Sequence, residues 1–314
     1  MPAYNRKPVP KQVLIFGASG HIGGPMAQIM TRDAPTIALR LVSHSVEKAE
    51  QLRTRFPAAD IVVADYTDRT SLDRAVAGME GIFVICPGGT DERKAMTNLI
   101  AAIKAEGAAT HILRQVGLQP EANARRIPTS LNGPGSLALP VQHALVKQML
   151  DESELPVTYL NCGATFMNNF IRSDMARHLR ERQTLVWPER LIPWIDTREV
   201  GEIAARIMLS DNQRHIGQFH TINNGHDLMR FSDVAALMSE VLGIPITHDA
   251  SREGFLAGYP QMGPAAAYLW EFFMYEQDNE VVWALNDFAE RILGRKPKTV
   301  REWLVEHRDA LVRG

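Results

Sequence analysis

A glycine-rich turn near the start of the chain constrains the fold more than any other stretch of the sequence. The apolar run 13–16 (VLIF) leads directly into the segment 17–23 (GASGHIG), and a helical pattern follows at once. A continuous apolar run bounded by glycine is typical of a strand that is buried on both faces, as in parallel sheets. The order of strand, glycine turn and helix therefore predicts the first βα unit of a doubly wound α/β fold.

The glycines of this turn suit the binding of a dinucleotide. Gly17 would allow the tight turn, Gly20 the close approach of a pyrophosphate, and Gly23 the close packing of helix on strand. The free amides at the helix start favour phosphate. The spacing is G-x-x-G-x-x-G, and a purely structural turn is the alternative. The coenzyme contacts predicted here are Gly17, Ser19, Gly20, His21, Ile22 and Gly23.

Apolar runs and helical patterns alternate as far as residue 161. Strands are expected at 37–42, 61–64, 81–86, 111–114 and 157–161, and helices at 47–55, 70–77, 91–106 and 140–150. With right-handed crossovers this order predicts a doubly wound parallel sheet, the Rossmann arrangement, for a dinucleotide-binding domain at residues 1–160. Residues 161–314 are expected to form a smaller mixed region that shapes a substrate pocket, with a strand near 218–222 returning to the sheet.

The C-terminal half shows a less regular pattern. Its expected elements are helices at 169–182, 197–209, 231–242 and 299–307 and a strand at 184–187. Asp196 and Glu199 form a plausible capping box for the second of these helices. The aromatic-rich stretch 268–275 is interpreted as packing or a subunit contact rather than a substrate box.

Two further stretches are expected to flank a bound coenzyme. Prolines and glycines interrupt every regular pattern from Gln119 to Leu139, and we expect a lid over the nicotinamide end there. The second strand ends at Ser43, His44 and, one turn on, Lys48, without a carboxylate that would repel a 2′-phosphate. This favours NADP(H) over NAD(H).

Two residues at later strand ends complete the predicted contacts. Asp65 follows the third strand, where a carboxylate can accept from the adenine amino group or cap the next loop. Pro87 follows the fourth strand, at the edge of the sheet where cofactor-flanking loops occur.

Composition narrows the class of protein. The 314-residue chain has a formal net charge of -2, which offers no general attraction to nucleic acid or to an anionic membrane. Cys86 and Cys162 are too few for a disulfide framework or a cysteine-rich metal site, and no metal is expected. Residues 1–11 lack the apolar core of a signal peptide, and no stretch approaches the roughly 20 apolar residues of a membrane span. We therefore expect a soluble, cytoplasmic protein.

His143 and Lys147 are the residues that could carry chemistry. They lie four residues apart on the expected helix 140–150 and therefore share a face, which the preceding loop allows to point at the nicotinamide. A neutral imidazole can donate a proton to a carbonyl or quinone oxygen as hydride arrives. A contact with the coenzyme or the lid is the alternative for His143, and a solvated surface residue is the alternative for Lys147.

These features resemble the short-chain dehydrogenase/reductase superfamily, and more narrowly its atypical NmrA-like branch. The segments that carry the resemblance are 17–23, 64–68 (ADYTD), 143–147, 155–160 (LPVTYL), 166–169 (FMNN) and 196–200 (DTREV). The resemblance implies that Lys147 holds the nicotinamide ribose and that His143 stands where the superfamily has a tyrosine. The superfamily's serine has no clear counterpart, since Gln115 and Val116 occupy that region, and this argues against strong carbonyl reduction.

The expected function is that of an NAD(P)H-dependent oxidoreductase that transfers hydride to a small carbonyl, quinone or activated alkene. An NAD(P)-sensing regulator without turnover is the alternative that the resemblance implies, and an isomerase with tightly held coenzyme is a third. The expected partner is a small molecule, and the sequence is compatible with a homodimer.

Overall fold

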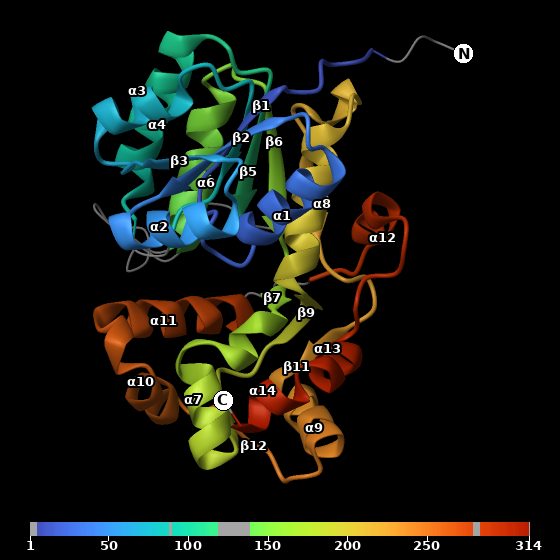
Figure 1. Cartoon of the computed structure of the whole chain (residues 1–314). Helices are drawn as coiled ribbons and strands as arrows, with labels where there is room; N and C mark the ends of the chain where they lie inside the picture. Colours follow the sequence, from blue (N-terminus) through green and yellow to red (C-terminus); the bar gives the residue numbers. More distant parts are fainter. Residues whose placement is uncertain (1–4, 88–89, 119–138, 279–282, 314) are drawn as a thin grey trace. The chain divides into compact units, whose positions relative to one another are not determined.

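The computed structural model describes residues 5–87, 90–118, 139–278 and 283–313 (Figure 1). Contacts within the chain divide it into two compact units. The first unit contains the described parts of 1–118, 139–162 and 198–221, and the second those of 163–197 and 222–314. Apart from Leu139, the lid expected at 119–139 lies outside the described residues. The domain boundary at residue 160 stays a prediction, because compactness alone does not show independent folding.

A seven-stranded sheet forms the centre of the first unit, in the order β10-β6-β5-β4-β1-β2-β3. Its strands are β1 (Gln12–Ile15), β2 (Ala38–Ser43), β3 (Asp60–Val63), β4 (Gly81–Val84), β5 (His111–Val116), β6 (Val157–Cys162) and β10 (Phe219–Ile222). Every adjacent pair from β3 to β6 is parallel. The doubly wound parallel sheet that the sequence predicts is therefore confirmed, and β10 forms one of its edges.

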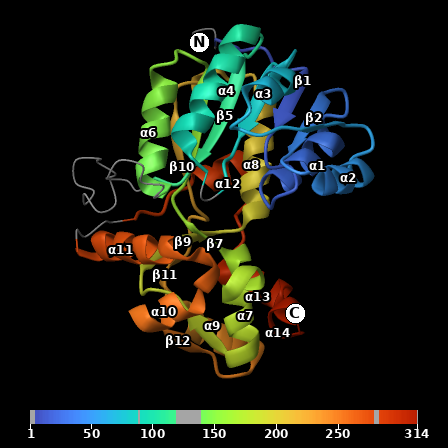
Figure 2. The same ribbon diagram turned by 90° about the vertical axis from the view of Figure 1, so that its left-hand side faces the viewer.

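Helices cover both faces of this sheet (Figures 1 and 2). They are α1 (Gly23–Asp33), α2 (Val46–Arg55), α3 (Arg69–Val76), α4 (Glu92–Glu106), α6 (Leu139–Asp151) and α8 (Thr197–Leu209). Helix α4 contacts both α3 and α6, whereas α1 packs closely with α2 and α8. Side chains that accept from first-turn amides start three of these helices, namely Ser45, Asp68 and Asp91.

The second unit is a smaller assembly of short elements. Its strands are β7 (Thr165–Phe166), β8 (Thr184–Val186), β9 (Leu191–Ile195), β11 (Leu228–Arg230) and β12 (Thr247–Asp249). Its α-helices are α7 (Ser173–Arg182), α9 (Phe231–Leu242), α10 (Arg252–Gly258), α11 (Pro264–Asp278), α12 (Phe288–Leu293), α13 (Val300–Glu306) and α14 (Arg308–Arg313). Trp194, Phe231 and Trp303 lie at the centre of its core and are fully buried. None of the helices described in either unit is long and apolar enough to span a membrane.

Two expectations for this unit gain detail from the structure. The helix expected at 169–182 is interrupted, because Arg172 adopts an extended backbone conformation (φ −133°, ψ 158°) between a short 3₁₀ turn and α7. The aromatic stretch lies on α11, where Trp270, Phe272 and Phe273 are buried while Tyr268 is 50% exposed. Three of its aromatic side chains therefore pack inside the unit, while a subunit contact stays a prediction.

His111, the first residue of β5, makes the stability of this fold depend on pH. Its side chain is fully buried, and its Nε2 lies 2.9 Å from Thr158 Oγ1. Thr158 donates its own proton to the carbonyl of His215, so the His111 ring must donate to Thr158 and carries its proton on Nε2. Burial, assisted by Lys7 and His215, lowers the pKa of His111 to about 3.

We expect the free energy of unfolding to fall as the pH drops below the histidine value of the unfolded chain, about 6.5. Between that pH and the folded-state pKa of about 3, the unfolded chain binds more protons, and each pH unit costs up to about 1.4 kcal/mol. Urea unfolding at several pH values measures this slope. His111→Gln should flatten it and His44→Gln, at an exposed position, should not; equal slopes for wild type and H111Q would contradict the assignment.

Candidate functional site

The glycine turn that follows β1 has the close backbone packing expected of a phosphate cradle. Gly17 adopts φ +68°, and a Cβ atom there would lie 2.6 Å from Cγ2 of Ile85, the residue that follows β4. The amide of Gly20 donates to the carbonyl of Gly17 over 2.9 Å and closes the turn. A side chain at Gly17 would meet both backbone strain and collision, so only glycine fits there.

Gly23 brings the start of α1 onto this turn. A Cβ atom at Gly23 would lie 2.5 Å from the carbonyl oxygen of Gly17 and 2.8 Å from its carbon, both of them backbone atoms. Helix α1 begins at Gly23 without a side-chain cap. The amides of Gly24 and Met26 donate to the carbonyls of Gly20 and Ile22, and Pro25 has no N–H. A helix start without a capping side chain still attracts a phosphate group through the helix dipole. On this turn Ser19 is exposed, His21 is half-buried and Ile22 is buried.

Gly201, on α8, packs against the backbone at the start of α1. The sequence analysis did not predict this contact. A Cβ atom at Gly201 would lie 2.6 Å from the carbonyl oxygen of Ile22 and 2.9 Å from the amide nitrogen of Met26. Helix α8 thus touches the first turn of α1 directly. The only sequence signal is a glycine inside a helical pattern, where glycine costs about 1 kcal/mol and so calls for a packing reason.

At the end of β2, the hydroxyl groups of Ser43 and Ser45 make hydrogen bonds within their own turn. Ser43 is buried, its Oγ donates to the carbonyl of Ser45 over 2.8 Å, and it accepts from the amide of the same residue. Ser45 Oγ accepts from the amide of Lys48 and caps α2. His44 and Lys48 are exposed. Of the residues predicted here as coenzyme contacts, the structure leaves His44 and Lys48 accessible and encloses Ser43.

Asp65 acts as a loop cap in this structure. Its Oδ1 accepts from the amide of Thr67 over 2.6 Å and from the hydroxyl of the same residue over 2.8 Å. These hydrogen bonds hold the pKa of the Asp65 carboxyl below its ordinary value. The capping interpretation therefore has direct geometric support, while an adenine contact stays a prediction. Pro87 is exposed directly beyond β4.

His143 is held at both ring nitrogens. The amide of Gly117 donates to its Nδ1 over 2.9 Å, which places the proton of the neutral ring on Nε2. Nε2 lies 3.3 Å from Oε1 of Glu92, and only 12% of the His143 side chain is exposed. The carbonyl of Gly117 also lies 3.2 Å from Nδ1, so the same residue offers an acceptor to a protonated ring. The ring can therefore gain or lose a proton without losing its backbone partner.

A buried ion pair lies next to His143, and the sequence analysis did not predict it. Glu92 and Arg114 are 1% and 0% exposed, and Nη2 of Arg114 lies 2.5 Å from Oε2 of Glu92. Burial by itself would raise the pKa of the Glu92 carboxyl, but His143 and Arg114 together hold it below its ordinary value. The amide of Glu92 donates to the side chain of Gln142. These contacts tie the start of α4 to α6 at the carboxyl edge of the sheet.

Lys147 has a different environment from His143, although both lie on α6. Its ammonium is 2.5 Å from Oδ2 of Asp151 and 5.0 Å from the centroid of the Tyr159 ring. The hydroxyl of Tyr159 donates to Oδ1 of Asp151 over 2.7 Å. Lys147 is thus engaged by an acidic neighbour, and binding a ribose would require it to leave or share that partner.

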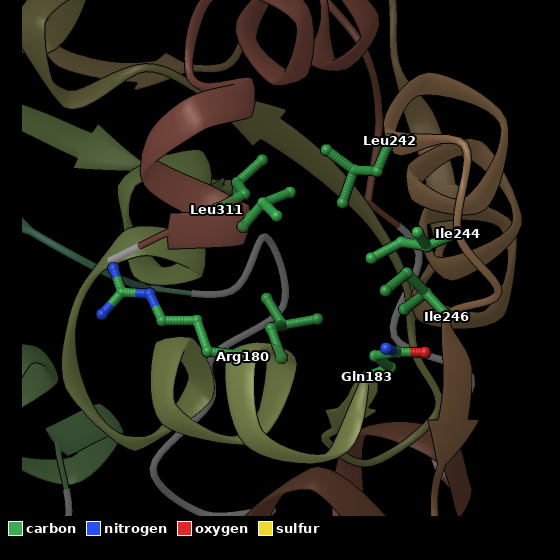
Figure 3. A pocket seen from close by; sticks show the side chains of 8 residues that line it. Arg180, Gln183, Leu242, Ile244, Ile246 and Leu311 are labelled. Carbon is green, nitrogen blue, oxygen red and sulfur yellow. The ribbon is translucent and has the colours of Figure 1, made fainter.

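Two hollows in the described residues do not serve as a dinucleotide site. The first, within the second unit, has a volume of about 80 Å³, too small for a dinucleotide (Figure 3). Its walls are mainly aliphatic, with Leu242, Ile244, Ile246 and Leu311 pointing into it. The second is an open hollow near the amino ends of β1 and β2, lined by Val9–Lys11 and Asp33–Ile37. It lies at the opposite edge of the sheet from the glycine turn.

The doubly wound sheet and its glycine turn define a dinucleotide-binding α/β protein. The turn fits such a group, because a Cβ atom at Gly23 would collide with the backbone of Gly17 and one at Gly17 with the side chain of Ile85, so both positions leave the turn free of side chains. The model of the NmrA-like family matches residues 10–304. The chain therefore belongs to the NmrA-like family, which confirms the resemblance described above.

Individual relatives are distant but match almost over their whole lengths. A (4-alkanoyl-5-oxo-2,5-dihydrofuran-3-yl)methyl phosphate reductase from Streptomyces griseus is 23% identical, covering 95% of this chain and 98% of that protein. The triphenylmethane reductase of Citrobacter sp., solved with NADP(H), superposes with a TM-score of 0.74 at 19% identity, covering 95% and 99% of the two chains. The negative transcriptional regulator NmrA, solved with NADP, gives 0.71 at 17% identity and 95% coverage of each chain.

Proposed function

We propose that this protein is an NAD(P)H-dependent oxidoreductase that passes hydride to a small carbonyl, quinone or activated alkene. The observation that carries the proposal is the glycine turn, where Gly23 brings α1 against the backbone of Gly17 with no room for a side chain. Reductases among the relatives support the activity. The reduced coenzyme supplies the hydride when bound, and the protein supplies binding, orientation and a proton.

The glycine turn, Lys147 and His143 each have a proposed part in this function. The amides of the turn hold the pyrophosphate, and Lys147 orients the nicotinamide ribose after exchanging Asp151 for it. His143 holds a proton on Nε2 and keeps Gly117 as its partner in either protonation state. To transfer this proton directly to a substrate oxygen, the imidazole of His143 must exchange one of its present contacts for that oxygen.

Calorimetric titration with NADPH and NADH, followed by an absorbance screen, tests the proposal. We expect binding of at least one reduced coenzyme and its oxidation in the presence of at least one carbonyl, quinone or enone. The likeness to NmrA favours a second candidate, a coenzyme-sensing regulator without turnover. Binding without oxidation by any acceptor would favour the regulator, and absence of binding would contradict both.

Variants at His143 separate proton donation from structural support. If His143 donates the proton, His143→Phe should lower turnover by about 100-fold or more and leave coenzyme affinity nearly unchanged, because general acid catalysis typically contributes that much. His143→Gln keeps a polar side chain beside Gly117 and Glu92 but cannot transfer a proton, so it should be equally slow. Steady-state kinetics and a melting curve of each variant measure this. Normal turnover in H143Q would show that the residue serves only as a support.

A further inference from the structure

Glu92, the first residue of α4, places a carboxylate next to the imidazole of His143 on α6. Helices α4 and α6 are in contact and lie side by side (Figures 1 and 2). Nε2 of His143 is 3.3 Å from Oε1 of Glu92, and both side chains are largely enclosed. Because little water reaches the two groups, the charge of the carboxylate acts on the ring with little screening.

The Glu92 carboxylate is ionised at neutral pH. Burial raises the pKa of this carboxyl, but its hydrogen bond with His143 and the charge of Arg114 outweigh burial, so the pKa lies below its ordinary value. The positive end of the α4 dipole, where Glu92 lies, adds to this effect. Arg114 donates to Oε2. Oε1 is left to face the imidazole, and no other described residue hydrogen-bonds to it.

The surroundings of the His143 ring suit its protonated form. An imidazolium has two N–H donors, whereas the neutral ring has one. Oε1 of Glu92 faces Nε2, and the carbonyl of Gly117 lies 3.2 Å from Nδ1. Each donor of the charged ring therefore has an acceptor. One of these acceptors is a carboxylate, which forms a stronger hydrogen bond with a charged donor than a neutral group does.

The other titratable groups near the ring do not replace Glu92. Arg114, on β5, is a cation and opposes protonation of the imidazole. Its neighbours Cys86 and Tyr66 are neutral, because burial raises the pKa of the Cys86 thiol to about 11 and that of the Tyr66 hydroxyl well above its ordinary value. Lys147, one turn further along α6, is paired with Asp151. Among the described residues that adjoin the ring, the charge that favours imidazolium is therefore that of Glu92.

We propose that Glu92 is a positioning residue that holds His143 in the protonated form from which a substrate oxygen takes its proton. The inference rests on the proposed function, because it assumes that His143 is the proton donor. In a carbonyl substrate, the carbon receives the hydride that the reduced coenzyme supplies, and the oxygen takes one proton from the imidazolium. The ring is then neutral and regains a proton from water.

An NMR titration of the histidine rings in coenzyme-free protein tests this proposal. The signal of His143 is assigned by its absence in H143Q, and the measured quantity is the pH at which half of that ring is protonated. Glu92→Gln should lower this midpoint by about one pH unit or more, because a favourable charge beside the ring is lost. Arg114→Gln should raise it, because an opposing charge is lost. Glu189→Gln is the matched control, since Glu189 lies 3.3 Å from Nδ1 of His248 instead and its loss should leave the His143 midpoint unchanged.

The opposite signs separate this role from structural support. E92Q and R114Q break the same buried ion pair, so a general loosening of the structure would move both midpoints in the same direction. The double variant E92Q/R114Q leaves neither charge unpaired, and its midpoint should lie below that of R114Q by about one unit or more. This comparison decides the question even if E92Q alone does not fold.

Turnover provides a second measurement once an acceptor is found. The pH above which kcat falls should move down in E92Q by the same amount as the NMR midpoint, with KM unchanged. Equal midpoints in wild type and E92Q, or shifts in the same direction in E92Q and R114Q, would overturn the inference. If the midpoints move as expected but no acceptor is reduced, Glu92 still controls the charge of His143, and it is the proposed function that fails.

Discussion

Replacing Arg114 with methionine is expected to lower the free energy of unfolding by about 3–5 kcal/mol, the cost of leaving one member of a buried ion pair alone. Methionine fills much of the same volume, so the main change is the loss of the charge next to Glu92. The Glu92 carboxylate is 1% exposed and would keep only the imidazole of His143, whose Nε2 lies 3.3 Å from Oε1, beside it. Urea unfolding at pH 7 measures the loss.

The control for this variant is a second arginine–glutamate pair on the surface. Arg53 and Glu50 lie 2.6 Å apart with side chains that are 48% and 66% exposed. Arg53→Met should cost no more than about 1 kcal/mol, because water screens exposed pairs. A similar loss in R53M and R114M would show that burial does not control the strength of the Arg114 contact.

A double variant identifies the cause of the expected loss. Arg114→Met combined with Glu92→Leu removes both charges, and apolar replacement of a buried pair is often nearly neutral. We therefore expect the double variant to recover most of the stability lost in R114M, a coupling that a double-mutant cycle measures. If the double variant is no more stable than R114M, the unpaired carboxylate is not the reason for the loss.

The comparison of sequence and structure shows which features depend on local pattern. The strands of the sheet were predictable, because buried parallel strands read as short apolar runs such as 13–16 and 81–84. The strands β7, β9, β11 and β12 were not, because they obtain their pairing from distant partners in small sheets. A local apolar pattern does not show which distant segments pair.

The same limit applies to the candidate site. The glycine turn was predictable because Gly17, Gly20 and Gly23 are close in sequence and each has a local reason to be glycine. The contacts of His143 were not predictable, because Glu92 and Gly117 belong to other parts of the chain and only the fold brings them close. The sequence did contain one signal for the buried ion pair, namely Arg114 inside the apolar strand β5, because a charge in a buried strand requires a partner.

Replacing Gly23 with alanine is expected to abolish coenzyme binding or to raise the Kd by about 100-fold or more, close to 3 kcal/mol. The new Cβ atom would lie 2.5 Å from the carbonyl oxygen of Gly17 and 3.1 Å from the amide nitrogen of Ala18. These are backbone atoms of the turn, so the collision can be relieved only when α1 and the turn move apart. That movement separates the amides that are proposed to hold the pyrophosphate.

Gly107→Ala provides the matched control for Gly23→Ala. Gly107 ends α4 in the left-handed region (φ +71°), and a Cβ atom there meets nothing within 4 Å. Its alanine variant should lose about 1 kcal/mol of stability from backbone strain and bind the coenzyme as wild type does. Titration and urea unfolding of both variants therefore separate a local change at the turn from general destabilisation. Wild-type affinity in G23A would mean that the coenzyme does not depend on the contact between α1 and this turn, and the proposed site would have to be abandoned.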